Sequence, residues 1–236
     1  MKILHSWSSG KDSAWALHVL NQQHPGAVAA LLTTLNETMD RVAMHGVRRD
    51  VLEAQARAAG LPLRLVPIPH PCPNETYEAR MREAVAAAVA EGFTHASFGD
   101  LYLEDVRRYR EERLAGTGLQ PLFPLWGIPT RALAEQMLEG GLRARVVCVD
   151  TRVLEVSVVG REFDTSLLAD LPESTDPCAE NGEFHTCVYA GPMFAGPLHL
   201  ERGETVARYP FAWAELTLGP APLQRCAAPK EAEALV

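Results

Sequence analysis

The segment with the clearest chemical character is Ser8-Ser9-Gly10-Lys11-Asp12-Ser13, which follows a short apolar stretch and precedes a helical pattern. The first turn of a helix leaves backbone N–H groups unpaired, and the helix dipole places partial positive charge there. Gly10 would let the backbone approach an anion closely, the serines add hydroxyl donors, and Lys11 adds a full positive charge. The segment therefore predicts a phosphate-binding loop, with a serine-rich helix cap as the alternative.

Lys11 stands out because lysine occurs only at positions 2, 11 and 230, so that arginine supplies nearly all the basic side chains. The loop does not match the Walker A pattern G-x-x-x-x-G-K-[ST]. We therefore expect a phosphate loop of another type.

Gly99 and Asp100 come directly after residues 94–98, which have the pattern of a buried strand. Ligands of open α/β folds bind at the carboxyl ends of the parallel strands. A carboxylate facing a triphosphate there could hold Mg²⁺, which prefers few protein oxygens together with phosphate and water. The sequence equally allows Asp100 to cap a helix that begins near Glu104.

Arg110 and Arg113 lie three residues apart and share one face of the helix expected there. Guanidinium groups pair with carboxylate or phosphate through two parallel hydrogen bonds, which makes both residues candidate nucleotide contacts. The simpler alternative is a solvated helix, on which these arginines pair with Glu104, Glu111 or Glu112.

Glu180, Glu183 and His185 surround Gly182 just before an apolar strand. Two carboxylates and an imidazole could orient an incoming amine or take up its proton. A plain turn with solvated acids, or a zinc site with an uncommon ligand spacing, would account for the same residues.

Three other residues have simpler interpretations. We expect Cys178 and Cys187, which flank that segment, to be packing residues and not nucleophiles. His45, beside Gly46, comes just before the helix expected at 48–59. A surface or helix-capping role is favoured for His45.

Strand and helix patterns alternate along the first hundred residues and would position these groups. The expected strands cover 2–5, 28–32, 61–68 and 94–98, and two of the expected helices cover 12–20 and 48–59. A third, longer helix, which Asn74 or Thr76 could cap, is expected to run to Glu91 and to stop at Gly92. Repeated β-α units predict a parallel sheet with helices on both faces.

Proline and glycine crowd the chain between positions 116 and 129, and we place a domain boundary near residue 125. Beyond it, a helix at 130–139 and strands at 145–149, 186–189, 198–201 and 213–218 predict a smaller C-terminal α+β domain that ends near residue 220. We expect the Ala- and Pro-rich tail, 221–236, to fray.

The composition is that of a soluble globular protein, with 47% hydrophobic and 22% charged residues among 236. The net charge of −8 disfavours nucleic acid as a partner. The five cysteines contain no C-x-x-C pair, which favours reduced thiols in a cytoplasmic protein. We expect neither a signal peptide nor a membrane-spanning segment.

The loop Ser8-Ser9-Gly10-Lys11-Asp12-Ser13 resembles the PP-loop of ATP pyrophosphatases, which cleave ATP between the α- and β-phosphates. More narrowly, the chain to about Gly219 is similar to the ATP-binding diphthine–ammonia ligase family. The resemblance includes Gly99-Asp100, Tyr-Arg-Glu-Glu-Arg at 109–113, Pro-Leu-Trp-Gly at 124–127 and Glu-Asn-Gly-Glu-Phe-His-Thr at 180–186. It implies a five-stranded parallel sheet of the adenine-nucleotide α-hydrolase type over residues 1–125, followed by a smaller domain over 126–220.

Two segments depart from the pattern of that family. Its loop is usually Ser-Gly-Gly-Lys-Asp-Ser, where this chain has Ser9, and its Glu-Gly-Gly-Glu is Glu180-Asn181-Gly182-Glu183 here. These differences leave the ATP chemistry intact and the acceptor substrate open.

The resemblance implies a ligase that forms a carbon–nitrogen bond. A substrate carboxylate, on a small molecule or a modified protein side chain, would attack the α-phosphorus of ATP and release pyrophosphate. Ammonia or another small amine would then displace AMP to form an amide. The expected cofactors are ATP and Mg²⁺, the latter at Asp100. The residues implied as catalytic are Lys11, Glu180, Glu183 and His185, and those implied as nucleotide contacts are Ser8, Ser9, Gly10, Lys11, Asp12, Ser13, Gly99, Asp100, Arg110 and Arg113.

Two other functions are compatible with a PP-loop. A tRNA-modifying enzyme is disfavoured because the chain is acidic and lacks the cysteine pairs expected of a thiolase. A non-catalytic adenine-nucleotide-binding module is not excluded by sequence. Formation of a homodimer is also left open.

Overall fold

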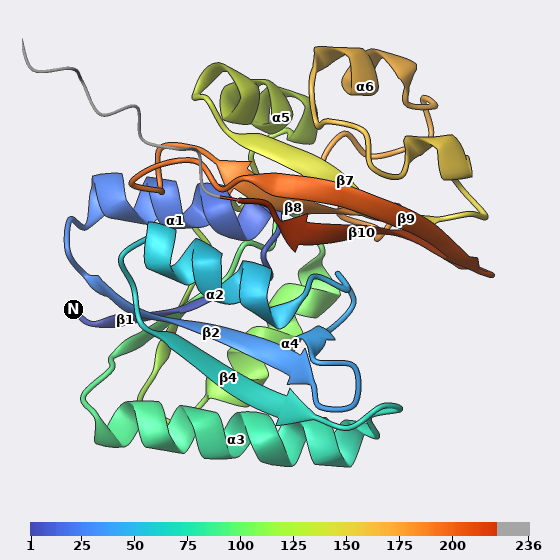
Figure 1. Cartoon of the computed structure of the whole chain (residues 1–236). Helices are drawn as coiled ribbons and strands as arrows, with labels where there is room; N and C mark the ends of the chain where they lie inside the picture. Colours follow the sequence, from blue (N-terminus) through green and yellow to red (C-terminus); the bar gives the residue numbers. More distant parts are fainter. Residues whose placement is uncertain (221–236) are drawn as a thin grey trace, which may run out of the picture.

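The computed structural model describes residues 1–220, and the tail 221–236, expected to fray, lies outside them. Helices and sheets alternate in layers (Figure 1). In that view α3 (Asn74–Ala90) lies at the bottom beneath the first sheet, and α1 (Lys11–Gln23) and α2 (Arg49–Ala58) lie above it. The second sheet covers α1 and α2, and α5 (Thr130–Glu139) and α6 (Thr165–Asp170) lie at the top.

Five parallel strands form the body of the first sheet, which confirms the predicted α/β fold. Their order is β4 (Leu63–Ile68), β2 (Val28–Asn36), β1 (Ile3–Ser6), β5 (His95–Ser97) and β6 (Gln120–Leu122). A two-residue strand, β3 (Arg41–Val42), adds to the end of β2 in the antiparallel sense. The predicted strands lacked β3 and β6, which are short and lie beside turn residues.

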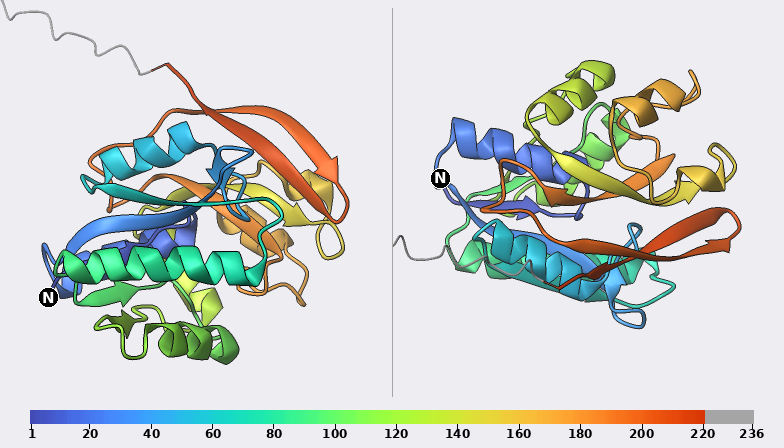
Figure 2. Two further views of the ribbon diagram at one scale, coloured as in Figure 1. Left: turned by 90° about the horizontal axis from the view of Figure 1, so that it is seen from below. Right: turned by 45° about the horizontal axis from the view of Figure 1, so that its top comes forward.

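Four antiparallel strands form the second sheet, as expected for a C-terminal α+β region. Their order is β8 (Phe184–Ala190), β7 (Arg143–Asp150), β10 (Phe211–Leu218) and β9 (Leu200–Arg208). A 3₁₀ turn, η1 (Val156–Val158), and helix α6 lie between β7 and β8. The β9–β10 hairpin reaches past the rest of this sheet (Figure 2).

Helix α1 is packed between the two sheets and contributes to the core that joins them. Ala14, Ala16, Leu17 and Leu20 are each 0–1% exposed. A helix buried on more than one side needs apolar residues beyond a single stripe, which α1 has. One core cluster extends from Ile3 in the first sheet through α1 to β7 and β8 in the second. The hydrophobic core therefore crosses the predicted domain boundary.

Helix α3 is packed much more loosely, since Ala88 is its one buried residue. Pro73 precedes the helix at the N-cap position, where no side chain accepts a hydrogen bond, so the predicted capping by Asn74 or Thr76 is wrong. None of the helices in residues 1–220 has the length and apolar character needed to cross a bilayer.

Candidate active site

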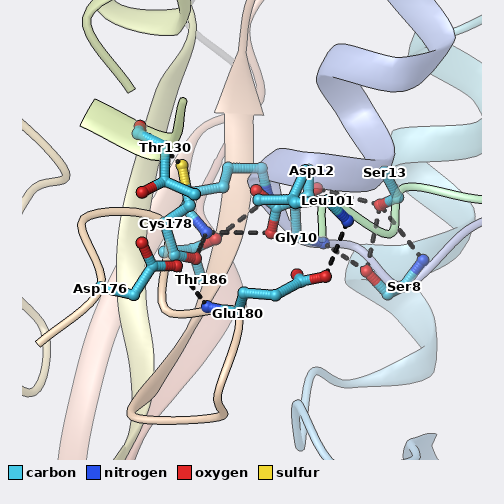
Figure 3. A network of polar contacts seen from close by, with 11 residues as sticks. Ser8, Gly10, Asp12, Ser13, Leu101, Thr130, Asp176, Cys178, Glu180 and Thr186 are labelled. Atoms are coloured by element: carbon cyan, nitrogen blue, oxygen red, sulfur yellow. Dashed lines mark hydrogen bonds and ion pairs between the residues drawn. The ribbon is translucent and has the colours of Figure 1, made fainter. Parts of the chain in front are cut away.

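The predicted phosphate loop joins β1 to α1 at the carboxyl edge of the parallel sheet. Gly10 is the N-cap of α1, and Ser9 before it has a φ of 74° in the left-handed region. The Ser8 and Ser13 hydroxyls lie 3.1 Å apart, and the Ser13 hydroxyl also donates to the Gly10 carbonyl at 3.0 Å. Figure 3 shows this turn beside the start of α1. The serines thus first shape the loop itself.

Strand β8 of the second sheet is hydrogen-bonded to the backbone of the loop. The Lys11 backbone N–H donates to the Thr186 hydroxyl at 3.0 Å, and the Val188 N–H donates to the Ser9 carbonyl at 3.0 Å. Both partners belong to β8. The loop is therefore built on residues from opposite ends of the described chain.

Gln55 of α2 reinforces that junction and was not predicted from sequence. Its side chain is fully buried, and its amide nitrogen donates to the Ser9 carbonyl at 3.2 Å and to the Val188 carbonyl at 2.6 Å. Its amide oxygen accepts from the Trp7 indole N–H at 3.1 Å. A polar residue on the apolar face of α2, between Leu52 and Ala56, was the signal that could have revealed it.

The Lys11 ammonium points into the protein and is 3% exposed. It donates to an Asp12 carboxylate oxygen at 2.9 Å and to the Cys178 carbonyl, and it lies 5.4 Å from the centre of the Phe184 ring. Burial disfavours its charge, but Asp12 and neighbouring acids outweigh burial and raise the pKa of Lys11. Lys11 therefore stays charged beneath the loop.

Glu180 lies next to the start of α1, close to both Asp12 and Asp100. One of its carboxylate oxygens accepts the Leu101 N–H at 2.7 Å (Figure 3). Burial raises the pKa of Glu180 to about 7, and the negative charges of Asp12 and Asp100 act in the same direction. Glu180 can therefore exchange a proton near neutral pH.

Glu183 is buried, with 5% of its surface exposed. One carboxylate oxygen accepts the Asp176 N–H at 3.1 Å and the Asn181 side-chain amide at 3.0 Å, while the other is buried without a hydrogen-bond partner. Asp12 Oδ1 is likewise buried without a partner. The interpretation of this segment as a plain solvated turn is therefore wrong.

His185 of β8 meets His45 from the turn between β3 and α2. The two ring centres are 4.5 Å apart and the rings are tilted by 39°. The N-cap of α2 is Arg48, and His45 is half-buried against His185, so the favoured role of His45 as a surface or capping residue is wrong. The proximity of His45 to the loop is tertiary and left no signal in the sequence.

Asp100 pairs with Arg110 and does not cap a helix. The Arg110 guanidinium donates to Asp100 at 3.4 Å and lies over the Phe98 ring. Helix α4 (Glu104–Leu114) has Leu103 at its N-cap, without a side-chain hydrogen bond. Arg113 is hydrogen-bonded to Glu78 of α3. The two arginines therefore do not pair with glutamates of their own helix, which was the simpler alternative.

Gly99 and Gly10 allow close approaches. A Cβ on Gly99 would lie 2.9 Å from the Ser13 backbone nitrogen, and a Cβ on Gly10 would lie 2.8 Å from His45 Nε2. A side chain at either position would therefore clash with this neighbour, and only glycine allows the close contact.

A cavity of about 980 Å³ opens beside the loop, between the sheet, α3 and α4. Its walls include predicted site residues from both halves of the chain, and its floor is apolar, with Leu4, Leu32, Ala96 and Phe98. The predicted residues that line it are Ser8, Arg110, Arg113 and His185, joined by His45. Lys11, Glu180 and Glu183 lie outside this lining. The volume is within the range of small-molecule sites.

The buried cysteines have the packing role that was expected of them. Burial raises the pKa of the Cys187 thiol to about 12 and raises that of Cys178 further. Neither is a thiolate at neutral pH.

Within residues 1–220, no group of three or more His, Cys, Asp or Glu side chains is arranged to hold a metal ion. This argues against the zinc alternative at Glu180–His185. The Mg²⁺ role of Asp100 stays a prediction, and one oxygen of that carboxylate lies 3.4 Å from the Arg110 guanidinium.

Two family models match the chain, one after the other. Residues 1–120 match the diphthamide synthase N-terminal domain, and residues 129–216 match the diphthamide synthase C-terminal domain. The chain belongs to the diphthamide synthase family. No curated protein matches it closely enough to count as a relative.

Membership of the diphthamide synthase family confirms the resemblance drawn from the separated sequence motifs. It supports an ATP-binding ligase as the coarse function. The reaction, the acceptor, the role of each site residue and the boundary near residue 125 stay predictions.

Proposed function

We propose that the protein is an ATP-dependent amide-forming ligase that releases AMP and pyrophosphate. In the first step a carboxylate oxygen of the acceptor bonds to the α-phosphorus of ATP, and the α–β phosphoanhydride bond breaks to release pyrophosphate. In the second step ammonia attacks the acyl carbon, AMP leaves, and the nitrogen loses one proton. The products are an amide, AMP and pyrophosphate.

The observation that carries the proposal is the position of the loop in a chain of this family. Its serines and the first turn of α1 lie at the carboxyl edge of a parallel sheet, beside a cavity large enough for a nucleotide. Helix N-termini in this position bind phosphates through backbone N–H groups. Adenylation makes chemical sense because it converts a carboxylate, which is a poor acyl donor, into one with AMP as leaving group.

Lys11 supports the first step from beneath the loop. Its ammonium is charged, desolvated and fixed by Asp12 and the Cys178 carbonyl, so its field acts on the loop without reorganisation. Two carboxylates near the loop could hold Mg²⁺: Asp12, whose Oδ1 is buried without a hydrogen-bond partner, and Asp100, of which one oxygen lies 3.4 Å from Arg110. When bound, Mg²⁺ would supply positive charge for the phosphate oxygens.

Glu180 is the residue best suited to the second step. Ammonium must lose a proton before its nitrogen can attack, and a carboxylate with a pKa of about 7 can accept it at neutral pH. Asp12 and Asp100 beside it favour a cation at this point. Glu183 fixes the turn that carries Glu180, through its bonds to Asp176 and Asn181.

The test is a screen for amide formation with ¹⁵N-ammonium as the nitrogen donor. The protein, ATP and Mg²⁺ are incubated with pools of carboxylic acids, including a protein that carries diphthine, and products are analysed by mass spectrometry. We expect an acid that gains one ¹⁵N and loses one oxygen, in step with pyrophosphate release. A protein that binds ATP but activates none of the acids would favour the non-catalytic nucleotide-binding module.

A further inference from the structure

The position of His45 beside the loop depends on Gly10. The Nε2 atom of His45 lies 2.8 Å from the point that a Cβ on Gly10 would occupy. The imidazole therefore rests against the backbone of the N-cap residue of α1, where the helix dipole is positive. A site for an anion next to Gly10 would have His45 as its wall.

His45 and His185 act from two different parts of the chain on one cavity. His45 comes from the turn after β3 and His185 from β8, and their ring centres are 4.5 Å apart. Both line the 980 Å³ cavity, together with Ser8 of the loop. Two imidazoles and a hydroxyl thus converge where the loop meets the open space.

The surroundings of this pair keep both rings neutral when no anion is bound. Burial, His185 and the Lys11 ammonium of α1 lower the pKa of His45, and the Ala43 carbonyl is the one group that acts the other way. Burial, followed by Lys11, lowers the pKa of His185 to about 4. No carboxylate is among the groups that act on either ring.

We propose that His45 and His185 form a polyphosphate-binding pair that takes up a proton from solution when the phosphates of the nucleotide enter, and returns it when they leave. The ligand class, a di- or triphosphate, rests on the proposed function. The reason for the uptake is electrostatic. An anion that contacts the rings raises an imidazole pKa by about 1–3 units, which moves the pair from fully neutral toward partly charged near pH 6. His45 then contacts the substrate directly.

The test is calorimetry of ligand binding to the full chain at pH 6 and pH 8, in two buffers with different ionisation enthalpies. The ligands are ATP with Mg²⁺ and inorganic tripolyphosphate, which lacks the adenosine. We expect uptake of roughly 0.1–1 proton per ligand at pH 6 and less at pH 8. When the pH is lowered from 8 to 6, the ligand affinity of wild type should rise by a factor up to about ten times larger than the corresponding factor for His45→Gln. His18→Gln, an imidazole of α1 outside the cavity, should behave as wild type.

A second measurement uses the wild-type protein alone and does not depend on how the variants fold. In spectra of ¹³C-histidine-labelled protein, two imidazoles should gain positive charge when tripolyphosphate is added at pH 6. The proposal that His45 and His185 bind phosphate with proton uptake would be contradicted if wild type took up no proton, or if His45→Gln took up as much as wild type. ATP binding without proton uptake would contradict the histidine proposal and would not affect the ligase proposal. Tripolyphosphate binding with uptake but no ATP binding would support the pair and contradict the ligase.

Discussion

At the scale of single residues, Ser9 occupies a backbone position that suits glycine. Its φ of 74° lies in the left-handed region, which costs a non-glycine residue about 1 kcal/mol or more. The family resemblance predicted glycine at this position, and glycine adopts the left-handed backbone without strain. The Ser9 hydroxyl has only a weak contact in return, to Cys187 Sγ at 3.6 Å.

We therefore expect Ser9→Gly to raise the free energy of unfolding by about 0.5–1 kcal/mol, since the strain removed exceeds the entropy that glycine adds to the unfolded chain. Urea denaturation measures this. Ser8→Gly is the matched control, because Ser8 has no left-handed strain and loses hydrogen bonds to Ser13 and Gly10. Equal destabilisation by both substitutions would contradict the strain.

Glu180 predicts a pH dependence of stability. Burial raises the pKa of Glu180 from 4.5 to about 7, so the folded protein holds this proton more tightly than the unfolded chain. The stabilisation is present below the unfolded pKa and is lost as pH rises through about 7. Urea unfolding should show that, from pH 5 to pH 8, the free energy of unfolding of wild type falls relative to that of Glu180→Gln. A difference between the two proteins that does not change with pH would exclude the raised pKa.

At the scale of elements, the end of β5 and the first turn of α1 fit together through Gly99. A Cβ there would lie 2.9 Å from the Ser13 nitrogen and 3.0 Å from the Asp12 carbonyl carbon, and backbone atoms cannot move aside as a flexible side chain can. Gly99→Ala should lower the free energy of unfolding by about 1–3 kcal/mol. Gly196→Ala is the control, because a Cβ at Gly196 meets nothing within 4 Å. If the two variants had the same thermal unfolding midpoint, a Cβ at Gly99 would not destabilise the fold and the prediction would be contradicted.

The longer elements were predictable from sequence because their local signals agree. The helix expected at 130–139 is α5, and the helix that Gly92 was expected to stop is α3. Short elements were missed where tertiary pairing decides the structure, as in β3, β6 and α6. The same limit applies to the site. Its loop is local and was predicted, whereas the contacts of Gln55 and His45 join segments distant in sequence.

At the scale of the whole molecule, the proposed nucleotide site draws residues from both sheets. Thr186 and Val188 of β8 bind the loop, Cys178 binds the Lys11 ammonium, and His185 reaches the cavity. The sequence divided the chain near residue 125 into a nucleotide domain and an acceptor domain. These contacts bring residues of the C-terminal half into the proposed nucleotide site, so we expect substitutions there to affect ATP binding.

The position at which ATP is cleaved tests the central proposal most directly. The protein is incubated with Mg²⁺, the carboxylic acid pool, ammonium and ATP labelled separately at the α- and γ-phosphates, and the products are separated by chromatography. The account predicts label from the α-position in AMP and label from the γ-position in pyrophosphate, in equal amounts. Label from the α-position in ADP, with γ-label in free phosphate, would mean acyl-phosphate chemistry and would contradict it.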